Sequence, residues 1–208
     1  MGAELEQKYV VISRRPWMVE ARLTAQLRRA GYQVLFLEEK PQKDTYYDTP
    51  GLDILAGGGS LRLREKGDRR ILTVKVPIRA EGGTFLRREE ELALAEGDDP
   101  ADFLRACLPQ VDPKGLTPTA VVDNRRRTYE VVRPAGGRFE LALDDVCYRD
   151  PATGREHRER QVELEAVAAT GADLEQVVSA LSLPELRSAQ ESKYQRAVTL
   201  TRGNDATG

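Results

Sequence analysis

Charged residues of both signs stand two positions apart near the start of the sequence: Glu4, Glu6 and Lys8. The β-branched run at residues 9–13 that follows them predicts a strand. Side chains two residues apart in a strand share one face, so a strand that already includes Glu4 carries two carboxylates and an ammonium on one side. Such a face is either solvated or one wall of a site.

Charged residues recur at the same spacing in later segments that also alternate like strands. They are Arg62 and Arg64, Lys75, Arg87 with Glu89 and Glu91, Arg125 and Arg127, Asp144, and Glu163 with Glu165. A sheet with one wet face explains any single segment. The basic and acidic doublets fall on separate segments, however, which favours cationic and acidic walls around one cavity. A polyphosphate would neutralise the arginines, and Mg²⁺ or Mn²⁺ would neutralise the carboxylates, since hard cations prefer carboxylate oxygen.

The elements that must position these residues are mostly short strands joined by turns rich in glycine and proline. The alternation of apolar residues predicts about eight strands. Helices are predicted at residues 16–30, 98–108 and 171–183, and a helix or helix-like tail at 186–200. This pattern indicates an α+β protein built on an antiparallel sheet or barrel, and the strand count favours one closed unit.

The sequence predicts a single domain over residues 1–208, with a disordered tail from about residue 202; a two-domain split near residues 96–118 is the alternative. Its 32 basic and 34 acidic residues nearly cancel, which argues against a nucleic-acid partner. The two cysteines have no metal-type spacing and indicate a reducing compartment. No run approaches the roughly 20 apolar residues of a membrane span, so we expect a cytoplasmic protein without a membrane partner.

Other familiar catalytic patterns are missing from the sequence. His157 is the only histidine and lies in a charged loop, where a catalytic role would lack an orienting partner. There is no G-x-S-x-G and no P-loop motif. The run Gly57-Gly58-Gly59 precedes a predicted strand, not a helix, and is interpreted as a turn.

Taken in order, these motifs resemble the CYTH superfamily, the triphosphate tunnel metalloenzymes. The opening ExExK stands here as ELEQK, and "DTYYDTPGLDILAGGGSLRLR", "LTVK", "RREEEL", "RRRTYEV", "LALDDV", "VELEAV" and "SKYQRA" follow in the family's order. The resemblance covers residues 4 to 200. It implies a closed antiparallel eight-stranded β-barrel, a tunnel with a charged interior and helices packed outside.

The resemblance also implies roles for individual residues. Lys8, Glu4 and Glu6 would be catalytic. The substrate-binding residues would be Arg62, Arg64, Lys75, Arg87, Arg125, Arg127 and Lys193. The metal ligands would be Glu4, Glu6, Glu89, Glu91, Asp144, Glu163 and Glu165, holding two Mg²⁺ or Mn²⁺ ions. The register stays open within Glu89–Glu91, within Arg125–Arg127, where Arg126 is the alternative, and between Asp144 and Asp145.

The leading hypothesis is a metal-dependent hydrolase of inorganic triphosphate (tripolyphosphate) or of a small organic triphosphate. The alternatives are an adenylate cyclase of the class IV type, a non-catalytic polyphosphate-binding module, and a plain barrel with a wet exterior. The expected partner is a small-molecule triphosphate, and a homodimer stays open.

The hypothesis requires that the charged faces point inward. Leu61 and Leu63 should then lie outside the barrel under the helices, because they alternate with Arg62 and Arg64. By the same alternation, the packed residues flanking the acidic motifs should be Leu5, Val162 and Leu164.

Overall fold

The computed structural model describes residues 5–79, 85–134, 136–181 and 183–203, with the backbone only at 78, 79 and 85–87. The strands are β1 (Glu6–Val11), β2 (Gln33–Asp48), β3 (Ser60–Lys66), β4 (Arg69–Arg79), β5 (Phe85–Leu94), β6 (Thr117–Val132), β7 (Arg138–Arg149), β8 (Glu156–Ala168) and β9 (Leu186–Ser188). The helices are α1 (Val19–Arg29), α2 (Asp53–Ala56), α3 (Ala101–Cys107), α4 (Gly171–Ala180) and α5 (Lys193–Arg202), with 3-10 turns η1 (Pro16–Met18) and η2 (Pro113–Gly115).

All nine strands form one sheet in the order β5-β4-β3-β2-β6-β7-β8-β1-β9, and every neighbouring pair is antiparallel. The prediction of an antiparallel sheet with helices is confirmed, but the closed eight-stranded barrel is not. In the described part of the chain the sheet has a ninth strand and stays open, with β5 at one edge and β9 at the other. β9, three residues long, pairs with the edge of β1 that a closed barrel would use for its last ladder.

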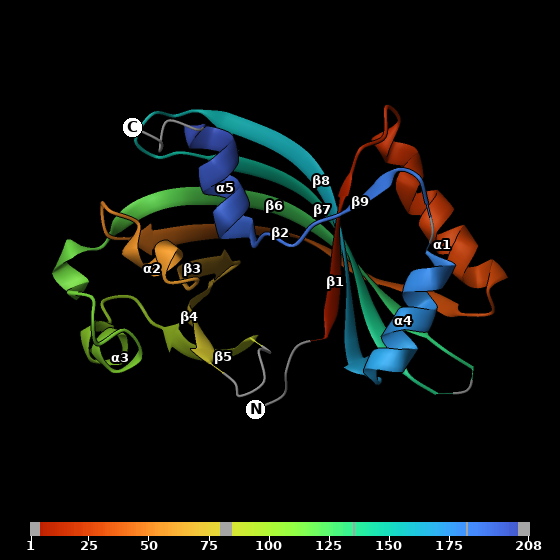
Figure 1. The fold of residues 1–208 in the computed structure, drawn as a ribbon, viewed down its shortest axis with the longest axis horizontal. Helices are drawn as coiled ribbons and strands as arrows, with labels where there is room; N and C mark the ends of the chain where they lie inside the picture. The colour runs from red at the N-terminus through yellow and green to blue at the C-terminus, as the bar shows by residue number, and fades with distance from the viewer. Residues whose placement is uncertain (1–4, 80–84, 135, 182, 204–208) are drawn as a thin grey trace.

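The two faces of the sheet carry different elements. We call the face on which α5 packs the inner face, and the opposite face, which carries α1, α2, α3 and α4, the outer face (Figure 1). At one end of the outer face, α1 and α4 cover apolar residues of β6, β7 and β8. At the other end, α2 and α3 cover apolar residues of β3 and β4.

The direction of the charged faces follows the prediction for most residues. Leu61, Val162 and Leu164 are buried in the outer-face clusters, and Leu63 packs against one of them, half-buried. The prediction for Leu5 is wrong, because its side chain remains 40% exposed. Leu5 lies just before β1 and belongs to neither outer-face cluster of the described residues, although its carbonyl accepts a hydrogen bond from the amide of Ala166.

These two leucines make a matched test of the packing. Leu164→Ala should lower the free energy of unfolding by about 2–5 kcal/mol, because a fully buried leucine leaves a cavity. Leu5→Ala should change it by about 0.5 kcal/mol or less, because the side chain is largely in solvent. Urea denaturation of both variants measures the difference. Equal losses would contradict the assignment of faces.

The helix predictions were right in kind and shifted at their boundaries. The tail predicted as a helix at residues 186–200 begins as β9, and α5 starts only at Lys193, where Ser192 caps it by accepting from the amide of Gln195. The predicted disordered tail lies mainly outside the described residues. No helix in the described ranges is both long and apolar enough to cross a membrane.

Candidate functional site

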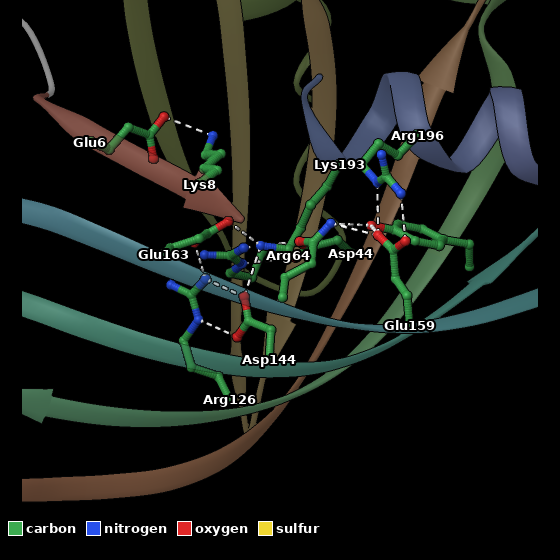
Figure 2. A network of polar contacts seen from close by, with 12 residues as sticks. Glu6, Lys8, Asp44, Arg64, Arg126, Asp144, Glu159, Glu163, Lys193 and Arg196 are labelled. Carbon is green, nitrogen blue, oxygen red and sulfur yellow. Dashed lines mark hydrogen bonds and ion pairs between the residues drawn. The ribbon is translucent and has the colours of Figure 1, made fainter. Parts of the chain in front are cut away.

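Four charged side chains meet at the centre of the inner face, each from a different element (Figure 2). The Arg126 guanidinium on β6 grips Asp144 on β7 with two hydrogen bonds, Nε to Oδ1 at 2.8 Å and Nη2 to Oδ2 at 2.6 Å. Arg126 also contacts Glu163 on β8. Lys193, the first residue of α5, donates to Asp144 at 2.9 Å and to Glu163 at 2.5 Å. We call these four residues the central cluster.

The four side chains of the central cluster are buried, so each charge needs the opposite charges of the cluster to stabilise it. The Asp144 side chain is fully buried, and those of Arg126, Glu163 and Lys193 are at most 18% exposed. Burial alone would raise the pKa of both carboxyl groups, but the charges of Lys193 and Arg126 outweigh it and hold each pKa below its ordinary value. Burial likewise would lower the pKa of Lys193, and the charges of Glu163 and Asp144 raise it instead. All four groups are therefore charged at neutral pH.

Helix α5 is fastened so that Lys193 reaches this cluster. A cation in the first turn of a helix opposes the helix dipole, so the position of Lys193 depends on its two carboxylate partners. Tyr194 stacks on Tyr46 with ring centroids 4.8 Å apart, and its hydroxyl donates to Asp48 at 2.8 Å. Two residues further, Arg196 binds Glu159 on β8 through two hydrogen bonds of 2.8 and 2.5 Å.

The buried pair of Arg196 and Glu159 gives a pH-dependent prediction. Burial alone would raise the pKa of Glu159, but the Arg196 hydrogen bonds and charge lower it below the ordinary value. A lowered folded-state pKa means that the pair stabilises the protein above the unfolded pKa of about 4.3 and loses this contribution as the pH falls through the folded value. The melting temperature of wild type should thus exceed that of Glu159→Gln at pH 6, and the gap should shrink below about pH 4. A gap that stays constant down to pH 3 would contradict this role for Glu159.

A second group of cations lies on the inner face of β3 and β4. Arg64 forms two hydrogen bonds with Asp44 of β2, at 2.8 and 2.7 Å, and Asp44 is 2% exposed. Arg62 lies 3.8 Å from the same carboxylate and donates to Thr73 at 3.1 Å. Lys75 pairs with Glu89 of β5 at 2.9 Å. Every cation of this group is thus held by the protein's own polar groups.

Glu6 and Lys8, near the opening of the chain, lie beside the central cluster. In the antiparallel ladder, Glu6 stands opposite Glu165 and Lys8 opposite Glu163. The Glu6 carboxylate is 2.7 Å from the Lys8 ammonium. Glu4 lies outside the described residues, so its predicted place next to Glu6 stays a prediction.

The carboxylates of Glu6, Glu163 and Glu165 are hard oxygen donors, and the ladder brings them to neighbouring positions on one face, which suits a divalent cation such as Mg²⁺ or Mn²⁺. Among the described residues, however, no three acidic, histidine or cysteine side chains are gathered closely enough to hold an ion. Glu163 contacts Arg126 and Lys193, and Glu6 contacts Lys8. Carboxylate oxygens of this kind fit a divalent metal ion. To bind one, Glu163 must turn away from Arg126 and Lys193, and Glu6 must turn away from Lys8.

Strand pairing resolves the registers that the sequence left open. Arg126, the alternative, faces inward, and the preferred Arg125 and Arg127 lie on the outer face. Arg125 has a 69% exposed side chain paired with Glu39, and Arg127 binds Glu20 of α1 and Asp145. The choice of Arg125 and Arg127 as inward residues was therefore wrong. Side chains alternate between the two faces of a strand, and β6 has Arg126 on the inner face, so its two neighbours lie on the outer face.

The remaining registers agree with the preferred choices as far as the structure describes them. Asp144 faces inward, and Asp145 pairs with Arg127 and Arg160 on the outer face. Glu89 and Glu91 stand opposite Lys75 and Thr73 on the inner face. These two glutamates lie on β5, which five strands separate from β8 in the sheet order, and no cluster of three acidic side chains joins them to Glu163 among the described residues. The side chain of Arg87 lies outside the described residues.

Several inner-face residues were not selected from the sequence. Asp44, which holds Arg64 and Arg62, sits in a strand segment whose alternate positions, Gln42 and Tyr46, are also buried. In the sequence, Asp44 stands two residues before Tyr46 and so shares its strand face, and this spacing could have selected Asp44. Glu159 continues the acidic spacing of Glu163 and Glu165, but its partner Arg196 comes from a helix whose position the sequence does not reveal.

The fold and the inner face define a class of protein: a bent antiparallel sheet with an ion-paired, charge-lined inner face and helices packed on its outer face. The chain belongs to the CYTH domain family, whose pattern matches residues 14–198. This family includes triphosphatases and adenylyl cyclases, and its triphosphate tunnel enzymes generally use divalent metal ions.

Solved structures share this fold at low sequence identity. A putative adenylate cyclase from Bacillus halodurans has a TM-score of 0.61 and 21% identity, over 93% of this chain and 96% of that chain. A putative adenylyl cyclase from Hippeastrum, described as having a dominant triphosphatase activity, has a TM-score of 0.60 and 16% identity, over 95% of this chain and 96% of that chain. A putative adenylate cyclase from Vibrio parahaemolyticus has a TM-score of 0.53 and 18% identity, over 95% of this chain and 98% of that chain. The comparison with curated proteins found no match.

Proposed function

We propose that this protein is a metal-dependent triphosphatase acting on inorganic triphosphate or a small organic triphosphate. One observation carries the proposal: Arg62, Arg64, Arg126 and Lys193, from two strands and a helix, are directed to one face and are held there by internal carboxylates. Cations kept charged and positioned in this way match the oxygens of a linear polyanion.

Binding would exchange partners within the site. The phosphate oxygens take hydrogen bonds from Arg126 and Lys193, which releases Glu163 from the two cations that now hold it. Glu163 can then turn toward Glu6 and Glu165, which the ladder holds on the adjacent positions. These three glutamates, with Glu4 as a further predicted ligand, would hold the divalent ion. When bound, this ion would supply Lewis-acid polarisation of the phosphoryl oxygens.

Hydrolysis adds water across the terminal phosphoanhydride bond and yields orthophosphate and a diphosphate. Both the transferred group and the leaving diphosphate carry negative charge, so positioned cations lower the barrier without a covalent nucleophile. Asp144 remains a fixed anchor for Arg126, since its carboxylate is the more deeply buried of the two. Lys8, which stands opposite Glu163 in the ladder, would contact the phosphoryl group undergoing transfer.

The test is phosphate release from tripolyphosphate, thiamine triphosphate and ATP, each with Mg²⁺ and with Mn²⁺, together with chromatography of the ATP products. Release of orthophosphate that stops in excess EDTA supports the proposal. Cyclic AMP as the main product of ATP would replace it with the cyclase that the three structural neighbours described above are named for. Tight binding of tripolyphosphate without turnover would leave a polyphosphate-binding module.

A further inference from the structure

Two uncharged amide side chains lie in the middle of the charged inner face. Gln42 on β2 and Asn124 on β6 stand directly opposite each other in the ladder. They are 7% and 6% exposed, so both are more than nine-tenths buried. Both share the inner face with Asp44 and Arg126, since each lies two residues from one of these along its strand.

Both amides have an orphaned polar atom. The side-chain oxygens Oε1 of Gln42 and Oδ1 of Asn124 are buried and have no hydrogen-bond partner within the described part of the chain. Buried polar groups in folded proteins are almost always hydrogen-bonded, and leaving one unpaired costs free energy. Two such groups side by side therefore call for a partner that the free protein does not supply from its own side chains.

The position of the amide pair indicates what the partner is. The ladder row that contains Gln42 and Asn124 lies between two ion-paired rows, that of Arg64 with Asp44 and that of Arg126 with Asp144. Successive inward residues of a strand are about 7 Å apart, so each arginine row is one such step from the amides. The two guanidinium groups repel each other across this gap: burial and the charge of Arg126 would lower the pKa of Arg64, and the hydrogen bonds and charge of Asp44, together with Tyr46, raise it instead. An anion that bridges both arginines must pass over the amides.

We propose that Gln42 and Asn124 form a neutral subsite that hydrogen-bonds the oxygens of a linear polyphosphate spanning Arg64 and Arg126. This proposal rests on the proposed function and adds to it the residues that contact the middle of the anion. The unpaired atoms are amide oxygens, which accept and do not donate, so phosphate binding requires each amide to turn by 180° and present its NH₂ group. A primary amide allows this turn, because its two ends have nearly the same shape. The NH₂ groups bind phosphate oxygen without adding a positive charge between two arginines, where a third cation would increase repulsion in the free protein.

The experiment compares Gln42→Leu, Asn124→Leu and the double variant with wild type. Tripolyphosphate binding is measured by calorimetry with and without Mg²⁺, and the melting temperature is measured without ligand. We expect each single variant to weaken binding about ten- to a hundredfold, the effect of one lost hydrogen bond to a charged group. The melting temperature of the free protein should stay the same or rise, because an unpaired buried polar group has been removed. Gln195→Leu, an exposed amide on α5, is the matched control and should change neither quantity.

If the two amides served only the folding of the free protein, the leucine variants would lower the melting temperature and leave the affinity for tripolyphosphate unchanged. If the amides are satisfied inside the free protein, the leucine variants should melt well below wild type or fail to fold, and this result would overturn the proposal. Unchanged affinity in folded variants would overturn it as well. Wild type that binds tripolyphosphate without hydrolysing it ends the triphosphatase proposal and leaves the subsite standing. If wild type hydrolyses tripolyphosphate and the leucine variants bind it as tightly as wild type does, only the subsite proposal fails.

Discussion

Replacing Arg126 with alanine is expected to lower the free energy of unfolding by about 3 kcal/mol or more, because it leaves buried carboxylates without a partner. Asp144 is fully buried and would keep only Lys193, which it must share with Glu163. The loss should appear in urea denaturation as a lower midpoint with an unchanged slope. The same variant should lose affinity for tripolyphosphate, since Arg126 is one of the four converging cations.

The neighbouring arginines provide controls within three consecutive residues. Arg125→Ala should cost less than about 1 kcal/mol, because its side chain is 69% exposed and exposed ion pairs contribute little. Arg127→Ala should destabilise the contact between the sheet and α1 without weakening tripolyphosphate binding, because its partners Glu20 and Asp145 lie on the outer face. If Arg125→Ala weakened binding and Arg126→Ala did not, the assignment of faces in β6 would be wrong.

Glu6→Gln is expected to reduce turnover of the preferred triphosphate at least about a hundredfold while the protein stays folded, the size of effect seen when a group that stabilises transition-state charge is removed. Glu6 is partly exposed and paired only with Lys8 among the described residues, so its replacement should change the free energy of unfolding by less than about 1 kcal/mol. Steady-state kinetics with Mg²⁺ and with Mn²⁺, alongside denaturation, separates the two effects.

Glu65→Gln is the matched control for Glu6→Gln. Glu65 lies on the outer face of β3, where it pairs with Lys43 at 3.5 Å, and its replacement should leave turnover unchanged. Excess EDTA should abolish turnover in wild type and in Glu65→Gln alike. Full activity in EDTA, or a Glu6→Gln enzyme that works like wild type, would remove the metal from the proposal.

Local alternation in the sequence is enough to predict which side chains share a face, wherever charged and apolar residues alternate strictly. Arg62 and Arg64 point away from Leu61 and Leu63, and Glu163 points away from Val162 and Leu164, as the alternation predicted. The physical reason is local: a strand repeats every two residues whatever its neighbours are. The ordered motifs also identified the family, because each motif keeps its own spacing.

Where several residues of the same type follow one another, alternation does not show which of them face inward. Arg125, Arg126 and Arg127 form the same pattern in either register, and only pairing with β7 places Arg126 beside Asp144. The number of strands was also beyond local pattern, because β9 is a three-residue segment that becomes a strand by pairing with β1.

The pairing of the charges depends on tertiary contacts that no local pattern predicts. Lys193 meets Asp144 across 49 residues and Glu163 across 30, and it does so because Tyr194 and Arg196 fasten α5 to the inner face. The unpaired amides of Gln42 and Asn124 likewise exist as a pair only through the ladder between β2 and β6. Residue types and spacing specify each strand separately, whereas a site built from several strands and a helix depends on long-range packing that no single segment encodes.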